Sequence, residues 1–249
     1  MKPERVRIFG VPLDCVTMEE AVDYADEIIQ NSNSAESVIA VNPEKIIKAH
    51  QDESLLNRLN KSGLLIPDGI GAVIAAKLFG LSQTISRVPG SELMPELCNL
   101  AANKNYSVFL YGANDEVNQQ ACENLLKLYP NLNIAGRQHG FVSEAEMAGL
   151  IDKINLSKAQ ILFIALGSPR QEMWMDKYMP QLEHVRICQG VGGTFDVIAG
   201  NVKRAPLLFR KLHLEWFYRL ACQPKRILRQ KALPLFAWKV VCHKASTVF

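Results

Sequence analysis

The sequence predicts an α/β protein in which a parallel sheet carries helices on both faces. Short apolar runs alternate with helical patterns from residue 36 to residue 193. Most of these runs are continuously apolar, as expected of strands that are covered on both faces. Repeated strand–helix units make successive strands parallel, because each helix returns the chain to the same end of the sheet. We therefore expect a doubly wound sheet, followed by a helical segment at the C-terminus.

Six segments are predicted to be strands, and helical patterns lie between them. The strands are expected at residues 37–41, 63–66, 106–112, 132–136, 160–167 and 185–190. The helices are expected at residues 43–61, 69–80, 91–103, 114–128, 143–157 and 168–179. Ser143 and Glu146 form a capping-box pattern, and Pro43 and Pro169 lie where the first turn of a helix tolerates proline. These signals indicate where three of the helices begin.

Composition indicates a folded protein in a reducing compartment. Hydrophobic residues make up 48% of the chain and charged residues 21%, which suits a large core and argues against disorder. The six cysteines are scattered, with no C-x-x-C pair and no histidine at ligand spacing, so a zinc site is not expected. The N-terminus, MKPERVRIFG, lacks the apolar core of a signal peptide, and no run approaches the ~18–20 apolar residues of a spanning helix. We expect a cytosolic protein.

Positive charge is concentrated in the last fifth of the chain. Residues 201–249 contain eleven lysines and arginines against one acid, Glu215, which gives this segment a formal charge of +10. The whole chain carries +3, so residues 1–200 carry −7. Such a division predicts a basic appendage with an anionic partner, and nucleic acid, a lipid phosphate surface and a diphosphate all have the required sign. We expect an α/β domain at residues 1–200 and a basic, amphipathic helical appendage at residues 201–249.

Polar residues or glycines follow each predicted strand. They are Asn42, Asp68, Gly112, His139, Gly167 and a glycine-rich turn that begins at Gly190. In open α/β sheets, ligands bind beyond the carboxyl ends of the strands, where these residues would meet. Each of them alone is ordinary loop chemistry; Asp68, for example, follows a strand in LLIPDG, and aspartate is a common turn and capping residue. Together they line one rim, and we expect a ligand site there.

The turn that contains Gly190, Gly192 and Gly193 precedes a helical stretch, so its backbone N–H groups are candidates to bind phosphate oxygens. It does not complete the dinucleotide fingerprint G-x-G-x-x-G, and it comes late in the chain. The sequence also has no Walker A motif, no G-x-S-x-G elbow and no H-E-x-x-H. It has no D-x-D, so a metal-bound diphosphate would lack its usual ligands, and N–H groups and arginines would have to stabilise a leaving diphosphate. Neither a metal nor another cofactor is predicted.

Seven segments of the chain resemble the WecG/TagA/CpsF family, glycosyltransferase family 26, over roughly residues 5–232. They are VNPEK (41–45), PDGIG (67–71), RVPGSEL (87–93), HGF (139–141), GSPRQE (167–172), GVGGTFDVIAGNVKRAP (190–206) and LEWFYRL…QPKRILRQ (214–230). The long GVGGTFD…KRAP…LEWFYRL pattern is the most distinctive. The resemblance implies a Rossmann-like domain with a C-terminal helical appendage. It also implies metal-independent transfer of a sugar from UDP to polyprenyl-diphosphate-linked N-acetylglucosamine.

The resemblance implies an N-acetylmannosamine-type donor but does not identify it. TagA-type members donate N-acetylmannosamine (ManNAc), WecG-type members donate its uronate (ManNAcA), and other relatives use other UDP-hexoses for capsules and exopolysaccharides. Some members carry threonine two residues before the asparagine, where this chain has Ala40. A hydroxyl contact is therefore missing, and the donor sugar and the polysaccharide pathway stay open.

Site residues carry over from the resemblance one by one. The family's proposed general base falls on Asp68, which would accept the proton of the attacking acceptor hydroxyl. Asn42 and Gln171 match polar pocket residues that would position sugar hydroxyls, and Arg87 matches the arginine of an R-V-x-G pattern. We therefore expect Asp68 to be a base rather than a turn residue.

The remaining site predictions concern the nucleotide and a diphosphate. UDP is expected over the glycine turn, with Asp196 a candidate for the ribose or the base. The predicted donor-binding residues are Gly112, His139, Gly167, Gly190, Gly192, Gly193 and Asp196. The appendage arginines Arg219, Arg226 and Arg229 match diphosphate-binding arginines of the family. The sequence does not tell whether that diphosphate belongs to UDP or to the lipid acceptor.

The appendage is also expected to bring the protein to a membrane surface. It combines basic charge with aromatic side chains but lacks spanning length, which favours peripheral attachment to the cytoplasmic face. A nucleic-acid-binding module that uses the same basic segment is the alternative from another class, and a nucleotide-dependent oxidoreductase is the third. Neither alternative is preferred, and a basic nucleic-acid module gives no reason for a rim of Asn, Asp and Gln. The oligomeric state is left open, a homo-oligomer included.

Overall fold

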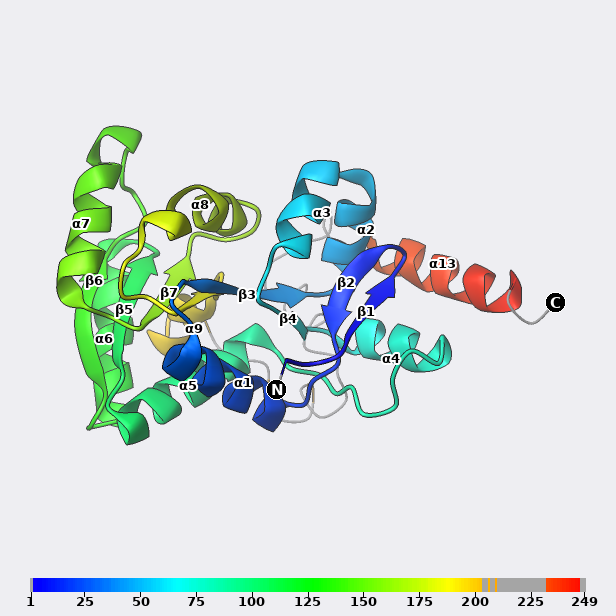
Figure 1. Ribbon diagram of the computed structural model, residues 1–249, viewed down its shortest axis with the longest axis horizontal. Coiled ribbons are helices and arrows are strands. Elements are labelled where there is room, and N and C mark those ends of the chain that lie inside the picture. The colour runs from blue at the N-terminus through cyan, green and yellow to red at the C-terminus, as the bar shows by residue number, and fades with distance from the viewer. Residues whose placement is uncertain (1, 203–205, 207–208, 210–231, 247–249) are drawn as a thin grey trace.

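The structure is a computed structural model, and it describes residues 2–202, 206, 209 and 232–246. A six-stranded, fully parallel sheet lies at its centre, with the strand order β4-β3-β8-β7-β5-β6 (Figure 1). The strands are β3 (Glu36–Val41), β4 (Leu64–Pro67), β5 (Ser107–Gly112), β6 (Asn133–Gln138), β7 (Ile161–Ala165) and β8 (Ile187–Gly190). All six predicted strands are present, so the predicted α/β class is confirmed.

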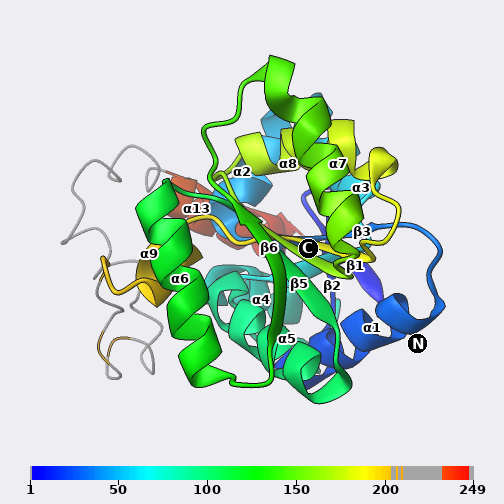
Figure 2. The same ribbon diagram turned by 90° about the vertical axis from the view of Figure 1, so that its left-hand side faces the viewer.

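Helices cover both faces of this sheet. One face carries α2 (Pro43–Gln51), α3 (Glu53–Asn60), α4 (Ile70–Leu78), α7 (Met147–Ser157), α8 (Arg170–Tyr178) and α13 (Ala232–Ser246). The other carries α1 (Met18–Asn31), α5 (Gly90–Lys104), α6 (Asp115–Leu128) and α9 (Thr194–Ile198). Figure 1 shows α2, α3 and α8 above the strands and α1 and α5 below them, and Figure 2 shows the same two layers from the end of the sheet at which β6 lies.

The two cores follow from the pleat of the strands, because successive side chains point to opposite faces. In β5, Phe109 and Tyr111 belong to the core under α7 and α8, while Val108 and Leu110 belong to the core under α5 and α6. Both sets are buried. A strand with two buried faces has to be apolar at every position, which is why these strands were recognisable in the sequence.

The predicted start signals are mostly confirmed. Pro43 is the first residue of α2, and Ser143 and Glu146 form a capping box at the short 3-10 helix η1 (Glu144–Glu146) that leads into α7. Pro169 is the N-cap of α8 rather than a residue of its first turn. A second 3-10 helix, η2 (Met179–Gln181), follows α8.

The prediction of one helix at residues 43–61 is wrong. The segment forms two helices, α2 and α3, with Asp52 between them. The Asp52 carboxylate accepts a hydrogen bond from Leu55 N at 3.0 Å and so caps α3. A side chain that bonds nearby backbone N–H groups competes with continuation of the helix, which is the physical reason for the break.

The hairpin of β1 (Arg5–Ile8) and β2 (Val11–Asp14) and helix α1 were not predicted, whereas helix α9 is the helical stretch expected after the glycine turn. The hairpin is tied to the main sheet through Asp14. Its buried carboxylate accepts hydrogen bonds from Arg5 Nε at 2.6 Å and from the backbone N–H of Leu65, in β4, at 2.7 Å. Short strands near the N-terminus are weak signals, and here a cross-strand ion pair, the long-range hydrogen bond from Leu65 and packing against β4 stabilise them.

A C-terminal helix is present, as predicted. Helix α13 packs against α2 and α4, with Phe236 and Val240 buried (Figure 1). No helix in the described part of the chain is long and apolar enough to cross a membrane. The five described cysteines are free, and Cys222 lies outside the described residues. The division into domains at residue 200 stays a prediction.

Candidate active site

The carboxyl ends of the strands form a rim from which the chain leaves in two directions. After β3 and β7 it turns to the face of α2 and α8, and after β5 and β8 it turns to the face of α6 and α9. Strand β8 lies between β3 and β7 in the sheet. Adjacent strands whose loops turn to opposite faces leave a crevice between them, which is where ligands bind in open α/β sheets. The glycine turn after β8 lies beside this position.

Three of the predicted site residues meet at the ends of β3 and β4. The backbone N–H of Asp68 donates to Val41 O at 2.9 Å, and a Cβ built on Gly69 would lie 3.6 Å from Asn42 Cβ. Val88 N donates to Pro67 O at 2.9 Å, which holds Arg87 beside the same strand end. The structure therefore brings Asn42, Asp68 and Arg87 to one part of the rim, although they come from three separate segments.

Asp68 does not cap the helix that follows it. The N-cap of α4 is Gly69, at φ = +130°, and it provides no side chain. A glycine suits this backbone conformation because L side chains rarely adopt it. Asp68 is therefore not the N-cap residue of α4, and it lies half-buried at the end of β4.

Asn42 has a structural role in addition to its predicted one. Its side-chain Oδ1 accepts a hydrogen bond from Lys45 N at 2.8 Å and caps α2. In the part of the chain that the structure describes, its Nδ2 group has no hydrogen-bond acceptor. The cap fixes the orientation of the amide and leaves Nδ2 as a hydrogen-bond donor without an acceptor among the described residues.

Gln171 is buried, and it contacts the glycine turn. Its Oε1 accepts a hydrogen bond from Gly192 N at 3.1 Å, and a Cβ on Gly190 would lie 2.5 Å from its Nε2. A side chain at position 190 would displace the Gln171 amide, which occupies its space. The N–H of Gly192, which we expected to bind phosphate, is therefore engaged within the protein. Gly193 is exposed, and among the described residues its N–H has no acceptor.

A buried ion pair that sequence reasoning missed joins the two segments that carry Asn42 and Gln171. Lys45 Nζ lies 2.6 Å from Glu172 Oε1, with side-chain exposures of 10% and 0%. Lys45 is in the first turn of α2 and Glu172 in the first turn of α8. The second carboxylate oxygen, Oε2 of Glu172, is buried and has no partner among the described residues. The pair thus connects the loops on either side of β8.

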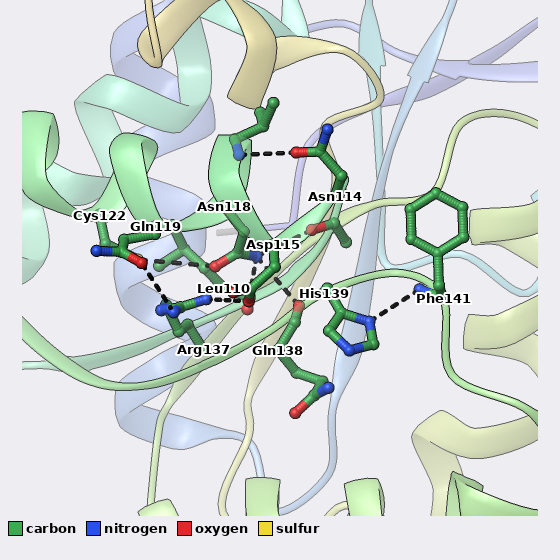
Figure 3. A network of polar contacts seen from close by, with 12 residues as sticks. Leu110, Asn114, Asp115, Asn118, Gln119, Cys122, Arg137, Gln138, His139 and Phe141 are labelled. Atoms are coloured by element: carbon green, nitrogen blue, oxygen red, sulfur yellow. Dashed lines mark hydrogen bonds and ion pairs between the residues drawn. The ribbon is translucent and has the colours of Figure 1, made fainter.

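The loops after β5 and β6 are joined by Asn118, which is fully buried (Figure 3). Its Nδ2 group donates to Gly112 O at 2.9 Å and to Gln138 O at 3.1 Å. His139 Nδ1 accepts from the backbone N–H of Phe141 at 3.2 Å, and the Phe141 ring is exposed. Gly112 and His139 therefore lie on one connected part of the rim, as a shared role in donor binding would require.

Arg137 lies on the same part of the rim, and Asp115 compensates its charge (Figure 3). Arg137 Nη1 donates to Asp115 Oδ1 at 2.5 Å, and this hydrogen bond lowers the pKa of the Asp115 carboxyl. An arginine that is already paired is a weaker ligand for a diphosphate, because the anion has to compete with the carboxylate.

Of the predicted donor-binding residues, Asp196 lies beside the glycine turn and Gly167 contacts Gln171. A Cβ on Gly193 would lie 3.8 Å from Asp196 Oδ2, which places that carboxylate beside the turn. Gly167 O accepts a hydrogen bond from Gln171 N at 3.0 Å. The predicted diphosphate-binding residues Arg219, Arg226 and Arg229 lie outside the described residues. Among the described residues, no three His, Cys, Asp or Glu side chains gather as a metal site would require.

The fold and the rim define a Rossmann-like α/β protein with a carboxylate, amides and a glycine turn at the carboxyl ends of its strands. The profile of the glycosyl transferase WecG/TagA/CpsF family matches residues 6–248, and the chain belongs to this family. It is accordingly a glycosyltransferase.

Two relatives from Staphylococcus aureus, of strains MRSA252 and NCTC 8325 / PS 47, are each 35% identical to the chain over 238 residues. The aligned region covers 95% of this chain and 92% of either relative. Both are named N-acetylglucosaminyldiphosphoundecaprenol N-acetyl-beta-D-mannosaminyltransferase.

Proposed function

We propose that this chain transfers a ManNAc-type residue from a UDP-sugar to N-acetylglucosaminyl-diphospho-undecaprenol, with inversion at the anomeric carbon. The relatives' printed name supports the acceptor and the sugar, and the similarity covers nearly the whole of both chains. The observation that carries the proposal is the meeting of Asp68, Asn42 and Arg87 at the ends of β3 and β4.

In this proposal Asp68 is the general base. It accepts the proton of the acceptor hydroxyl while the hydroxyl oxygen forms a bond to the anomeric carbon of the donor. The bond from that carbon to the UDP oxygen breaks, and its electron pair leaves with UDP. The half-buried position of Asp68, on the strand end next to the one that Asn42 follows, suits a carboxylate that has to meet one sugar hydroxyl.

UDP is proposed to lie over the glycine turn, with the nucleoside toward Gly112 and His139. The exposed N–H of Gly193, at the start of α9, and the carboxylate of Asp196 support this orientation. Gln171 would act through the turn, because it holds Gly192 N at 3.1 Å. Arg87 and the appendage arginines Arg219, Arg226 and Arg229 would neutralise the diphosphate, and no metal is included in the proposal.

A donor screen tests the function. The protein is incubated with a short-chain lipid-diphosphate-GlcNAc and UDP-ManNAc, UDP-ManNAcA, UDP-glucose or UDP-galactose, each with and without EDTA, and products are identified by mass. We expect the mass of a ManNAc-type disaccharide, formed equally well with EDTA. A glucose or galactose product would establish the alternative donor. Transfer that stops with EDTA and returns with Mg²⁺ or Mn²⁺ would contradict the metal-free account.

We also propose peripheral attachment to the cytoplasmic face of the membrane. Support comes from α13, whose outer side exposes Leu235, Trp238 and Val241, the tryptophan by 67%. Lys239 and Lys244 lie on the same helix. Aromatic side chains favour the membrane interface, and each lysine near an anionic leaflet contributes about 1 kcal/mol.

Two sets of substitutions separate membrane binding from catalysis. Changing Lys231, Lys239 and Lys244 to Glu is expected to release the protein from anionic vesicles in a sedimentation assay, with transfer to a soluble short-chain acceptor preserved. Changing Arg226 and Arg229 to Ala is expected to reduce that soluble transfer strongly. Wild-type protein that does not sediment with vesicles at physiological salt would contradict the membrane proposal, and normal transfer by the double arginine variant would contradict the diphosphate role.

A further inference from the structure

The first turn of α5 lies against β3 and β8, just below the rim. A Cβ built on Gly90, the first residue of α5, would lie 3.5 Å from Ala40 Cβ and 3.9 Å from Ile66 Cδ1. The N-cap of α5 is Pro89, which provides no side-chain hydrogen bond. The N–H groups of Gly90 and Ser91 consequently lack acceptors among the described residues. First-turn N–H groups of this kind bind carbonyl or anionic oxygens well.

Gln189 presents an unpaired acceptor at the same place. It is fully buried in β8, and its Nε2 donates to Gly90 O at 3.1 Å. Its Oε1 is buried and accepts no hydrogen bond among the described residues. An unpaired polar atom in a protein interior is uncommon because its desolvation is not compensated, and at a functional site it points to a ligand group as the missing partner.

Ala40 lies between these groups and the rim. Val38 pairs with Gln189, so Ala40 lies two residues closer to the carboxyl end of the sheet and on the same face. It is half-buried and contributes only a methyl group. Two residues further along β3 is Asn42, beside the proposed base Asp68. Of the residues named here, Ala40 is therefore the one that a group projecting from the reacting sugar toward α5 would meet first.

We propose that Ala40, Gly90 and Gln189 form the subsite for the acetamido group of the donor sugar. An acetamido group has one N–H donor, one carbonyl acceptor and one methyl group. Gln189 Oε1 would accept the N–H, the N–H groups of Gly90 and Ser91 would donate to the carbonyl, and Ala40 with Ile66 would contact the methyl. The inference rests on the proposed function and names the substituent that the site selects.

Competition binding of UDP-ManNAc, UDP-mannose and UDP tests the subsite, because mannose differs from ManNAc by the absence of the acetamido group. We expect wild type to bind UDP-ManNAc about 10- to 100-fold more tightly than UDP-mannose, as one or two buried hydrogen bonds require. Gln189→Leu is expected to lower this preference below about 3-fold and to leave UDP affinity unchanged. An unaltered preference in Gln189→Leu would overturn the subsite.

Ala40→Val keeps the test decisive if Gln189→Leu does not fold. The added methyl groups fill the subsite, so UDP-ManNAc is expected to bind about tenfold more weakly while UDP-mannose is unaffected. The matched control is Ala135→Val, the same change at a half-buried position of β6. If Ala40→Val lost affinity for UDP-ManNAc and for UDP-mannose equally, the subsite would be contradicted. It would also be contradicted if wild type transferred ManNAc but bound the two sugar nucleotides with equal affinity. The proposed function itself would be overturned if wild type formed no product and bound neither UDP-ManNAc nor UDP-mannose more tightly than UDP.

Discussion

Replacing Asp68 with Asn is expected to lower kcat by about 10²–10⁴-fold, because an amide cannot accept the proton of the acceptor hydroxyl. The affinity for UDP should stay within about twofold of wild type, since the base meets the acceptor rather than the nucleotide. The measurements are initial rates with saturating donor and lipid-linked acceptor, and UDP binding by calorimetry. Asn has the shape of Asp, so the backbone hydrogen bond from position 68 to Val41 O is preserved.

The control for this change is Asp152→Asn, which removes a carboxylate from the exposed side of α7, away from the rim. It should leave both kcat and UDP affinity unchanged. Retention of more than about a tenth of wild-type kcat in Asp68→Asn would rule out its role as the base. Loss of UDP binding in parallel with turnover would instead assign Asp68 to nucleotide binding.

Lys45→Met is expected to reduce the free energy of unfolding by about 3–5 kcal/mol, because it leaves the buried Glu172 carboxylate without the one ion-pair partner that it has among the described residues. Denaturant unfolding measures the effect. Turnover should also fall, since the pair connects the first turns of α2 and α8, which carry Asn42 and Gln171. The double variant Lys45→Met, Glu172→Leu should recover most of the lost stability, because it buries no unpaired charge.

A second ion pair provides the matched control. Arg58 Nε, in α3, lies 3.3 Å from Asp176 Oδ2, in α8. This pair therefore also joins α8 to a helix of the segment after β3, but its side chains are 22% and 42% exposed. Arg58→Met should cost only about 0–1 kcal/mol, as is usual for exposed pairs. Similar losses in Lys45→Met and Arg58→Met would show that burial of the Lys45–Glu172 pair has no special consequence. Recovery of full activity together with stability in the double variant would show that the pair does not position the site.

Local sequence signals predicted the sheet because each strand contains the information for its own burial. A strand such as Ile161–Ala165 is covered on both faces and must be apolar throughout, so it is visible without knowledge of its neighbours. The capping box of Ser143 and Glu146 is equally local. The short strands of the N-terminal hairpin were missed because their stability depends on Asp14 and Leu65, which are distant in the sequence.

The sequence by itself determined the α/β class and, through its motifs, the family, and it predicted a site at the rim with Asp68 as the candidate base. Only the tertiary structure decided which rim residues meet and what each side chain does. Lys45 and Glu172 are 127 residues apart, and the unpaired oxygen of Gln189 becomes visible only against the first turn of α5. The physical reason is that the periodic pattern of apolar residues along a segment reports which of them are buried, whereas the partner of a side chain depends on the order of the strands in the sheet. In the order β4-β3-β8-β7-β5-β6, the strand that comes last in the chain, β8, lies between two earlier strands, β3 and β7.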